Sequence, residues 1–130
     1  MALLRLLLLL VLVMPARAQT PPSRVTFKQG DIGSILGRAV LDASATEIGR
    51  VVDVLVDGDG KPMVALLDVG GFMGLGVRRV AVGWETLRFS HDGAETTITE
   101  TLSYDDIAAG PEYRGDDGPI EVLTGPKAAP

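Results

Sequence analysis

Two carboxylates in a glycine-rich run are the first side chains in this sequence that could bind a cation. The run Asp57-Gly58-Asp59-Gly60 could begin a calcium loop, because Ca²⁺ prefers oxygen ligands such as carboxylates. An EF-hand loop that began at Asp57 would need glycine at its sixth position and glutamate at its twelfth, where this chain has Pro62 and Asp68. Asp-Gly pairs favour tight turns, so we predict a turn here and no metal site.

The chain has one histidine and no cysteine, which limits the enzymatic chemistry open to it. A zinc or iron site would need further histidine or cysteine ligands beside His91. A catalytic triad could combine His91 with Asp92 and a distant serine, but the chain lacks the Gly-x-Ser-x-Gly turn that exposes such a nucleophile. We predict no catalytic residue, no cofactor and no enzymatic activity.

A seven-residue glycine-rich segment, Gly70-Gly71-Phe72-Met73-Gly74-Leu75-Gly76, is the most noticeable motif. A phosphate-binding loop needs a strand before it and a helix after it, whereas a strand pattern follows this segment. Loops lie on the surface, and exposed apolar clusters mark contact sites. We therefore predict an interaction surface at Phe72, Met73 and Leu75. The alternative is that these side chains fold back over the mouth of the domain.

Asp53 and Asp68 are acidic residues inside valine- and leucine-rich runs. A carboxylate that faces a core must be paired or hydrogen-bonded, and Arg38, Arg50 and Arg79 could be the partners. We predict that both acids are structural. A catalytic carboxylate pair is the alternative, which nothing in their spacing favours.

Alternating apolar residues and turn signals predict six strands and one short helix to position these side chains. The strand patterns cover residues 37–41, 48–56, 63–69, 77–82, 86–90 and 95–100. The alternation of the second strand breaks near Gly49, which predicts a β-bulge. The helix should run from Ser103 to Ala109, with Ser103 and Asp106 spaced as in a capping box and Gly110-Pro111 as its stop signal.

Four blocks of this β region, in this order and spacing, resemble a PRC-barrel domain, the small β-barrel shared by the photosynthetic reaction-centre H subunit and a ribosome-maturation factor. The blocks are Ile35–Val40, Glu47–Asp57, Ala65–Gly71 and Val80–Leu87, and Pro111-Glu112-Tyr113 adds a further similarity. The resemblance implies an all-β fold, a small six-stranded PRC-barrel-like β-barrel with one short C-terminal helix. A closed barrel would leave no open sheet edge.

The resemblance also implies a function, because the known relatives dock onto other proteins. We therefore expect a protein-interaction or scaffold module, with a small-ligand or metal-binding protein as the alternative. Relatives usually have proline at the position of Gly83, next to the single tryptophan, Trp84. Trp84 could fill the core or anchor an interface, and we predict a structural role in the core because the chain has few aromatic residues.

The first 18 residues have the pattern of a secretory signal peptide. Arg5 precedes an apolar run of nine residues, Leu6 to Met14, and Ala16-Arg17-Ala18 has the small-x-small form of a cleavage site. The run is shorter than the about 20 apolar residues that span a bilayer, so we predict cleavage near Ala18 rather than an uncleaved anchor. The mature protein should be periplasmic or secreted, without stable membrane insertion.

The expected organisation is a signal peptide (1–18), a flexible lead-in (19–34), the PRC-barrel-like domain (35–102), a short helix and cap (103–113) and a disordered tail (114–130). Loss of residues 1–18 removes two arginines and no acids, leaving 10 basic against 17 acidic residues and a formal charge of −7. Such a surface repels nucleic acid. The expected partner is a protein of unknown identity, and a homodimer is the simplest case.

Overall fold

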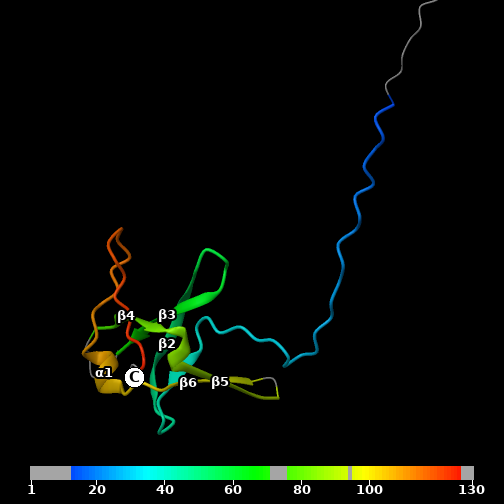
Figure 1. The fold of residues 1–130 in the computed structure, drawn as a ribbon. Helices are drawn as coiled ribbons and strands as arrows, with labels where there is room; N and C mark the ends of the chain where they lie inside the picture. Colours follow the sequence, from blue (N-terminus) through cyan, green and yellow to red (C-terminus); the bar gives the residue numbers. More distant parts are fainter. Residues whose placement is uncertain (1–12, 71–75, 94, 127–130) are drawn as a thin grey trace, which may run out of the picture.

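The computed structural model describes residues 13–70, 76–93 and 95–126. These residues form six strands and one short α-helix, with a turn of 3₁₀ helix, η2, at Trp84–Thr86 (Figure 1). The strands are β1 (Ala39–Leu41), β2 (Glu47–Val56), β3 (Pro62–Val69), β4 (Arg78–Gly83), β5 (Leu87–Asp92) and β6 (Glu95–Glu100), and the helix is α1 (Tyr104–Ala108). The predicted all-β fold with six strands and one C-terminal helix is confirmed.

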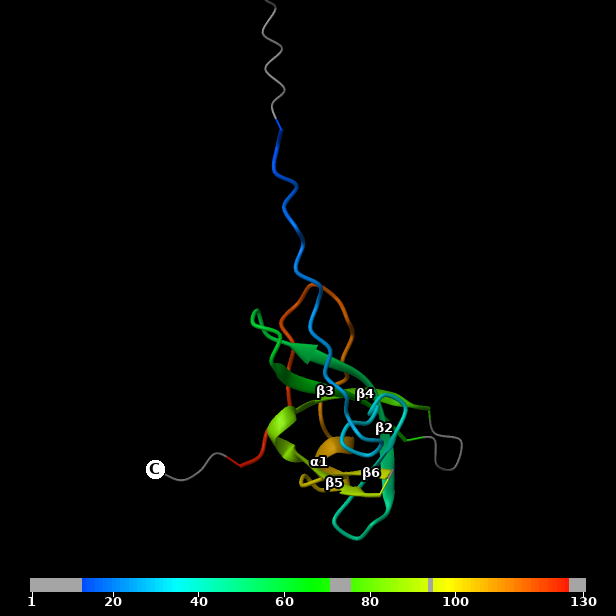
Figure 2. The same ribbon diagram turned by 90° about the vertical axis from the view of Figure 1, so that its right-hand side faces the viewer.

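The six strands form one curved sheet in the order β4-β3-β2-β1-β6-β5. Neighbouring strands are antiparallel except for β1 and β6, which run parallel. Figure 2 shows β3 beside β4, and β5 beside β6. β4 and β5 follow each other in the chain but lie at opposite ends of the sheet, joined by η2. The small β-barrel fold agrees with the prediction, but within the described residues no ladder closes the sheet between β4 and β5. The 3₁₀ turn η2 connects these two strands in the chain.

Strand β2 carries two extra residues that change which side chains face the core. Opposite β1, Val40 pairs with Gly49 and Leu41 with Glu47, which confirms the irregularity expected near Gly49. Opposite β3, Val51 pairs with Leu67 and Asp53 with Leu66, so Val52 is the extra residue. A bulge bends the strand and interrupts the strict alternation of its side chains.

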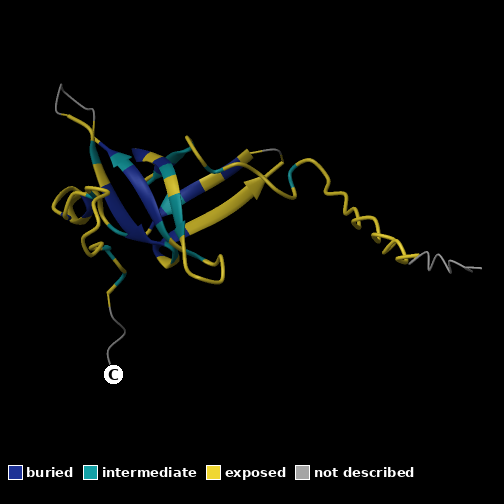
Figure 3. Cartoon of the chain, turned by 90° about the horizontal axis from the view of Figure 1, so that it is seen from above, coloured by how far each residue is buried: buried dark blue, intermediate teal, exposed yellow. Residues whose placement is uncertain are grey.

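The buried residues gather along the strands of the curved sheet (Figure 3), and Ile107 of α1 joins this core. Valine, leucine and isoleucine supply it because β-branched and other aliphatic side chains pack well on a pleated surface. Its fully or nearly fully buried members are Val40, Ile48, Val51, Ala65, Leu67, Val69, Val80, Val82, Leu87, Ile98 and Ile107.

Helix α1 is held at both ends and through one buried side chain. The Ser103 hydroxyl accepts a hydrogen bond from Asp106 N, as the capping pattern predicted. The Arg78 guanidinium donates to Ala108 O and, at 2.7 Å, to Gly110 O, satisfying carbonyls that a helix end leaves without partners. Ile107 is fully buried and attaches the helix to the core.

The N-terminal and C-terminal segments lie differently relative to the sheet. Residues 13–29 are exposed and extend away from the sheet. The C-terminal segment instead returns to the edge of β4, where Leu123 forms a parallel bridge with Val82. The disordered tail expected over residues 114–130 thus differs from the structure at Leu123, because an aliphatic side chain there finds an uncovered strand edge. No helix within the described ranges is long and apolar enough to cross a membrane.

Candidate interaction surface

The predicted interaction residues Phe72, Met73 and Leu75 lie outside the described residues. The two ends of their loop are described and lie close together, because a Cβ on Gly70 would be 3.1 Å from Gly76 O. Gly70 also has a φ of 101°, a left-handed conformation that favours glycine. The loop therefore starts and ends at one point, beyond the last β3–β4 pair, Val69 and Arg78.

An open groove lies beside the ends of this loop, and we call it the Val77 groove. Its volume is about 500 Å³. Val77 at its rim is 58% exposed. Backbone forms part of its floor, since a Cβ on Gly49 would clash with Asp68 O. The groove is lined by Gly37, Glu47, Ile48, Gly49, Arg50, Val52, Asp68, Gly70 and Val77.

The charged side chains around the Val77 groove are paired within the chain. Arg50 forms an ion pair with Glu47 at 3.1 Å and donates a hydrogen bond to Gly37 O at 3.0 Å. Asp68 accepts two hydrogen bonds from Arg79, at 2.8 and 3.1 Å. An apolar surface edged by internally satisfied charges can be covered by a partner without leaving these charges unpaired.

Asp68 and Arg79 are cross-strand partners on β3 and β4. This register brings the carboxylate and the guanidinium into a two-point ion pair. The hydrogen bonds from Arg79 to Asp68 raise the pKa of the guanidinium above its ordinary value. Arg79, one of the three arginines that the sequence suggested as partners, is therefore the partner of Asp68.

Asp53 lies in a different environment from the one expected. It is exposed, and its carboxylate accepts a hydrogen bond from Val54 N at 2.8 Å. The bulge at Val52 turns Asp53 away from the core face that Val51 occupies. The expectation that Asp53 faces the core does not match its exposed position.

Trp84 lies in η2 and is partly buried against the core cluster. Its ring centroid is 5.1 Å from that of Phe89, at a tilt of 34°, a favourable separation for aromatic rings. Phe89 is 37% exposed, so the pair spans core and surface.

Asp57 and His91, which first suggested chemistry, each make local hydrogen-bonding contacts in the described structure. Asp57 Oδ1 accepts hydrogen bonds from Asp59 N at 2.9 Å and Lys61 N at 3.0 Å, which makes it a turn residue. His91 is exposed at the end of β5 and contacts Thr96 Oγ1 at 3.1 Å. Within residues 13–70, 76–93 and 95–126, no group of three or more His, Cys, Asp or Glu side chains could hold a metal ion.

A buried polar network at Glu100 was missed by the sequence analysis. Glu100 and Thr86 are each 1% exposed. Thr86 Oγ1 lies 2.8 Å from Gly83 O and 2.9 Å from Glu100 Oε2, while Leu102 N donates to Glu100 Oε1 at 2.9 Å. A glutamate at a strand end gives no sequence signal of burial, because its burial depends on how β6 and η2 pack in the folded protein.

The Glu100 network is complete when the carboxyl group is protonated. Thr86 has one hydroxyl hydrogen, so it cannot donate to Gly83 O and to an ionised Glu100 at once. A protonated Glu100 donates to Thr86 Oγ1, and the Thr86 hydrogen remains for Gly83 O. Burial raises the pKa of Glu100, and the hydrogen bond that Leu102 N donates to it opposes that rise only in part.

The fold agrees with a comparison against protein families. The family model of the PRC-barrel domain matches residues 29–102, more than half of the 130-residue chain. The chain belongs to the PRC-barrel domain family, as the resemblance predicted, and membership indicates a scaffold or interaction module. A comparison with curated proteins found no match.

Proposed function

We propose that the protein is exported and acts as a non-catalytic protein-interaction module that uses the Val77 groove and the adjoining loop. The observation that carries this proposal is the groove itself, about 500 Å³ in volume, with an exposed valine on its rim and its charges already paired. It adjoins the loop that contains Phe72, Met73 and Leu75. Exposed apolar surface of this kind favours contact with another protein.

A second copy of the chain is the first partner to test. Symmetric dimers are the commonest assemblies of soluble proteins, and aromatic side chains such as that of Phe72 often anchor interfaces. We expect the mature chain, residues 19–130, to elute as a dimer at micromolar concentration in size-exclusion chromatography with light scattering.

Two variants and a matched control test this surface. Val77→Asp, and separately Phe72→Asp combined with Leu75→Asp, should weaken dimerisation at least about tenfold because they place charges in an apolar contact. Val56→Asp is the control, because Val56 is 55% exposed against 58% for Val77 but lies at the far end of β2. A protein that is monomeric before any substitution, or variants that stay dimeric, would overturn self-association through this surface.

A further inference from the structure

The outer edge of β4 is occupied by the chain's own C-terminal segment. Leu123 N donates to Ala81 O at 2.9 Å, and Gly83 N donates to Leu123 O at 2.7 Å. These two hydrogen bonds form an isolated parallel bridge between Leu123 and Val82. Tyr113 N donates to Arg79 O at 2.7 Å and holds the segment at a second point of the same edge.

The Leu123 side chain packs in an apolar site beside Gly110, which we call the Leu123 seat. Leu123 is half-buried and packs against the core cluster. Its Cδ1 atom occupies the space beside Gly110, where an added Cβ would lie 2.6 Å from it. Glycine at 110 thus leaves room for an aliphatic side chain, and larger residues would close the seat.

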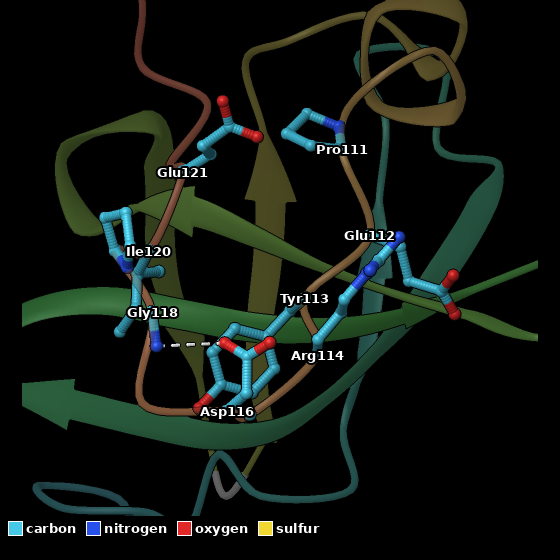
Figure 4. Close-up of a pocket in the computed structure, with 10 residues that line it drawn as sticks. Pro111, Glu112, Tyr113, Arg114, Asp116, Gly118, Ile120 and Glu121 are labelled. Carbon is cyan, nitrogen blue, oxygen red and sulfur yellow. Dashed lines mark hydrogen bonds between the residues drawn. The ribbon is translucent and has the colours of Figure 1, made fainter.

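The chain between the two anchor points is loosely attached. Residues 114–121 are all exposed. They surround an open cavity of about 420 Å³ lined by their own loop (Figure 4), in which Asp116 Oδ1 accepts a hydrogen bond from Gly118 N at 3.0 Å. The attachment of the end of the chain therefore depends on one bridge and one side chain.

We infer that the β4 edge is a binding site for an extended peptide segment of a partner protein that runs parallel to β4 and carries leucine, or a similar aliphatic residue, at the position of Leu123. Strand addition to an exposed sheet edge takes its affinity from main-chain hydrogen bonds and its specificity from side-chain pockets. The seated segment shows both features: two backbone hydrogen bonds to Ala81 and Gly83, and a seat beside Gly110. Residues 122–124 of the chain's own C-terminal segment occupy this site in the structure.

This site is separate from the Val77 groove, so either proposal can fail without the other. The tethered segment competes with any external peptide at an effective concentration of the order of millimolar. Unseating Leu123 should therefore expose the edge to a peptide added at micromolar concentration.

The test uses the full chain and a labelled peptide with the sequence of residues 119–126, followed by fluorescence anisotropy. Leu123→Asp should bind the peptide at least about tenfold more tightly than the unsubstituted chain. A peptide with aspartate in place of its leucine should not bind. The fluorescence of Trp84, the single tryptophan and the neighbour of Gly83, provides a second readout without a label.

Gly83→Pro supplies the matched control for the backbone contact. Gly83 has φ −62°, which proline adopts without strain, while proline lacks the N–H that bonds to Leu123 O. The nearest obstacle to its ring is the flexible Glu85 carboxylate. Leu123→Asp combined with Gly83→Pro should keep its circular dichroism spectrum and lose peptide binding.

A second variant covers the case in which Leu123→Asp does not fold. Leu123→Ala empties the seat beside Gly110 without adding a charge, so it should loosen the segment and leave both the edge and the seat open to the leucine peptide. Equal peptide binding by the variants and the unsubstituted chain, or equal binding of both peptides, would overturn the inference. Unfolding of both variants would also overturn it, since the segment would then be an integral part of the core.

Discussion

The buried carboxyl group of Glu100 makes stability depend on pH in a direction opposite to that of a surface carboxylate. Burial raises its pKa in the folded protein, so the folded state binds the proton more tightly than the unfolded chain. The stability contribution is fully present below the unfolded pKa and is lost as pH rises through the folded pKa. The hydrogen-bond network with Thr86 and Gly83 gives this titration a structural basis.

We predict that Glu100→Gln removes this pH dependence. The amide can donate to Thr86 Oγ1 and accept from Leu102 N, which reproduces the protonated carboxyl group. In thermal unfolding from about pH 4 to pH 8, the melting temperature of the variant should rise relative to that of the unsubstituted protein as pH rises. Glu100→Ala should cost about 1–3 kcal/mol, since it leaves buried polar partners unsatisfied. A constant difference between the Gln variant and the unsubstituted protein would show that Glu100 does not titrate in this range.

The two strand aspartates should respond differently to substitution. Asp53 is exposed, accepts a hydrogen bond from Val54 N and attracts Arg79 through its charge without an ion-pair contact to it in the described structure, so Asp53→Ala should change the free energy of unfolding by no more than about 0.5 kcal/mol. Asp68→Ala removes a two-point ion pair with Arg79 and should lower the melting temperature more. Each variant serves as the control of the other in the same thermal unfolding experiment, and equal effects would contradict the assignment.

At the scale of elements, α1 shows how a helix of five residues can be stable. Isolated short helices are marginal because nucleation is unfavourable. Here the Ser103 hydroxyl accepts a hydrogen bond from the first turn, and Arg78 donates hydrogen bonds to carbonyl oxygens at the C-terminal end. Ile107 supplies the buried contact. The helix also carries Gly110 at its end, beside the Leu123 seat.

Loss of the cap at Ser103 should weaken the whole domain. Ser103→Ala removes the acceptor for Asp106 N and should destabilise folding by about 0.5–2 kcal/mol. Ser103→Asn keeps an oxygen that can accept this hydrogen bond and should stay close to the original stability. Chemical denaturation of the two variants side by side would measure the cap, and equal losses would show that the hydroxyl does not contribute.

At the scale of the whole molecule, the N-terminal sequence predicts export. Mass spectrometry of the protein from its native cell should find a chain that begins at Gln19, because Ala16-Arg17-Ala18 has the form of a cleavage site. Gln19 could cyclise to pyroglutamate, which lowers the mass by one ammonia. Detection of an intact Met1 on a membrane-bound form would contradict cleavage.

The sequence by itself determined the elements and the family of this protein. Alternating aliphatic residues, Asp-Gly turns and the Ser103 cap are local signals, and they predicted six strands, one helix and their order. Bounds agreed to within two residues, as for β6 at Glu95–Glu100. Such features depend on neighbours two to four positions away, which a sequence displays directly.

The tertiary structure decided which faces and edges these elements present. An extra residue at Val52 turned Asp53 to the surface, and η2 left the sheet open between β4 and β5. Glu100 is buried beside Thr86, which lies 14 positions earlier in the chain, and Leu123 packs beside Gly110. Each outcome depends on contacts between distant parts of the chain. The run Ile120-Glu121-Val122-Leu123 has β propensity, but only the free edge of β4 determines where it binds.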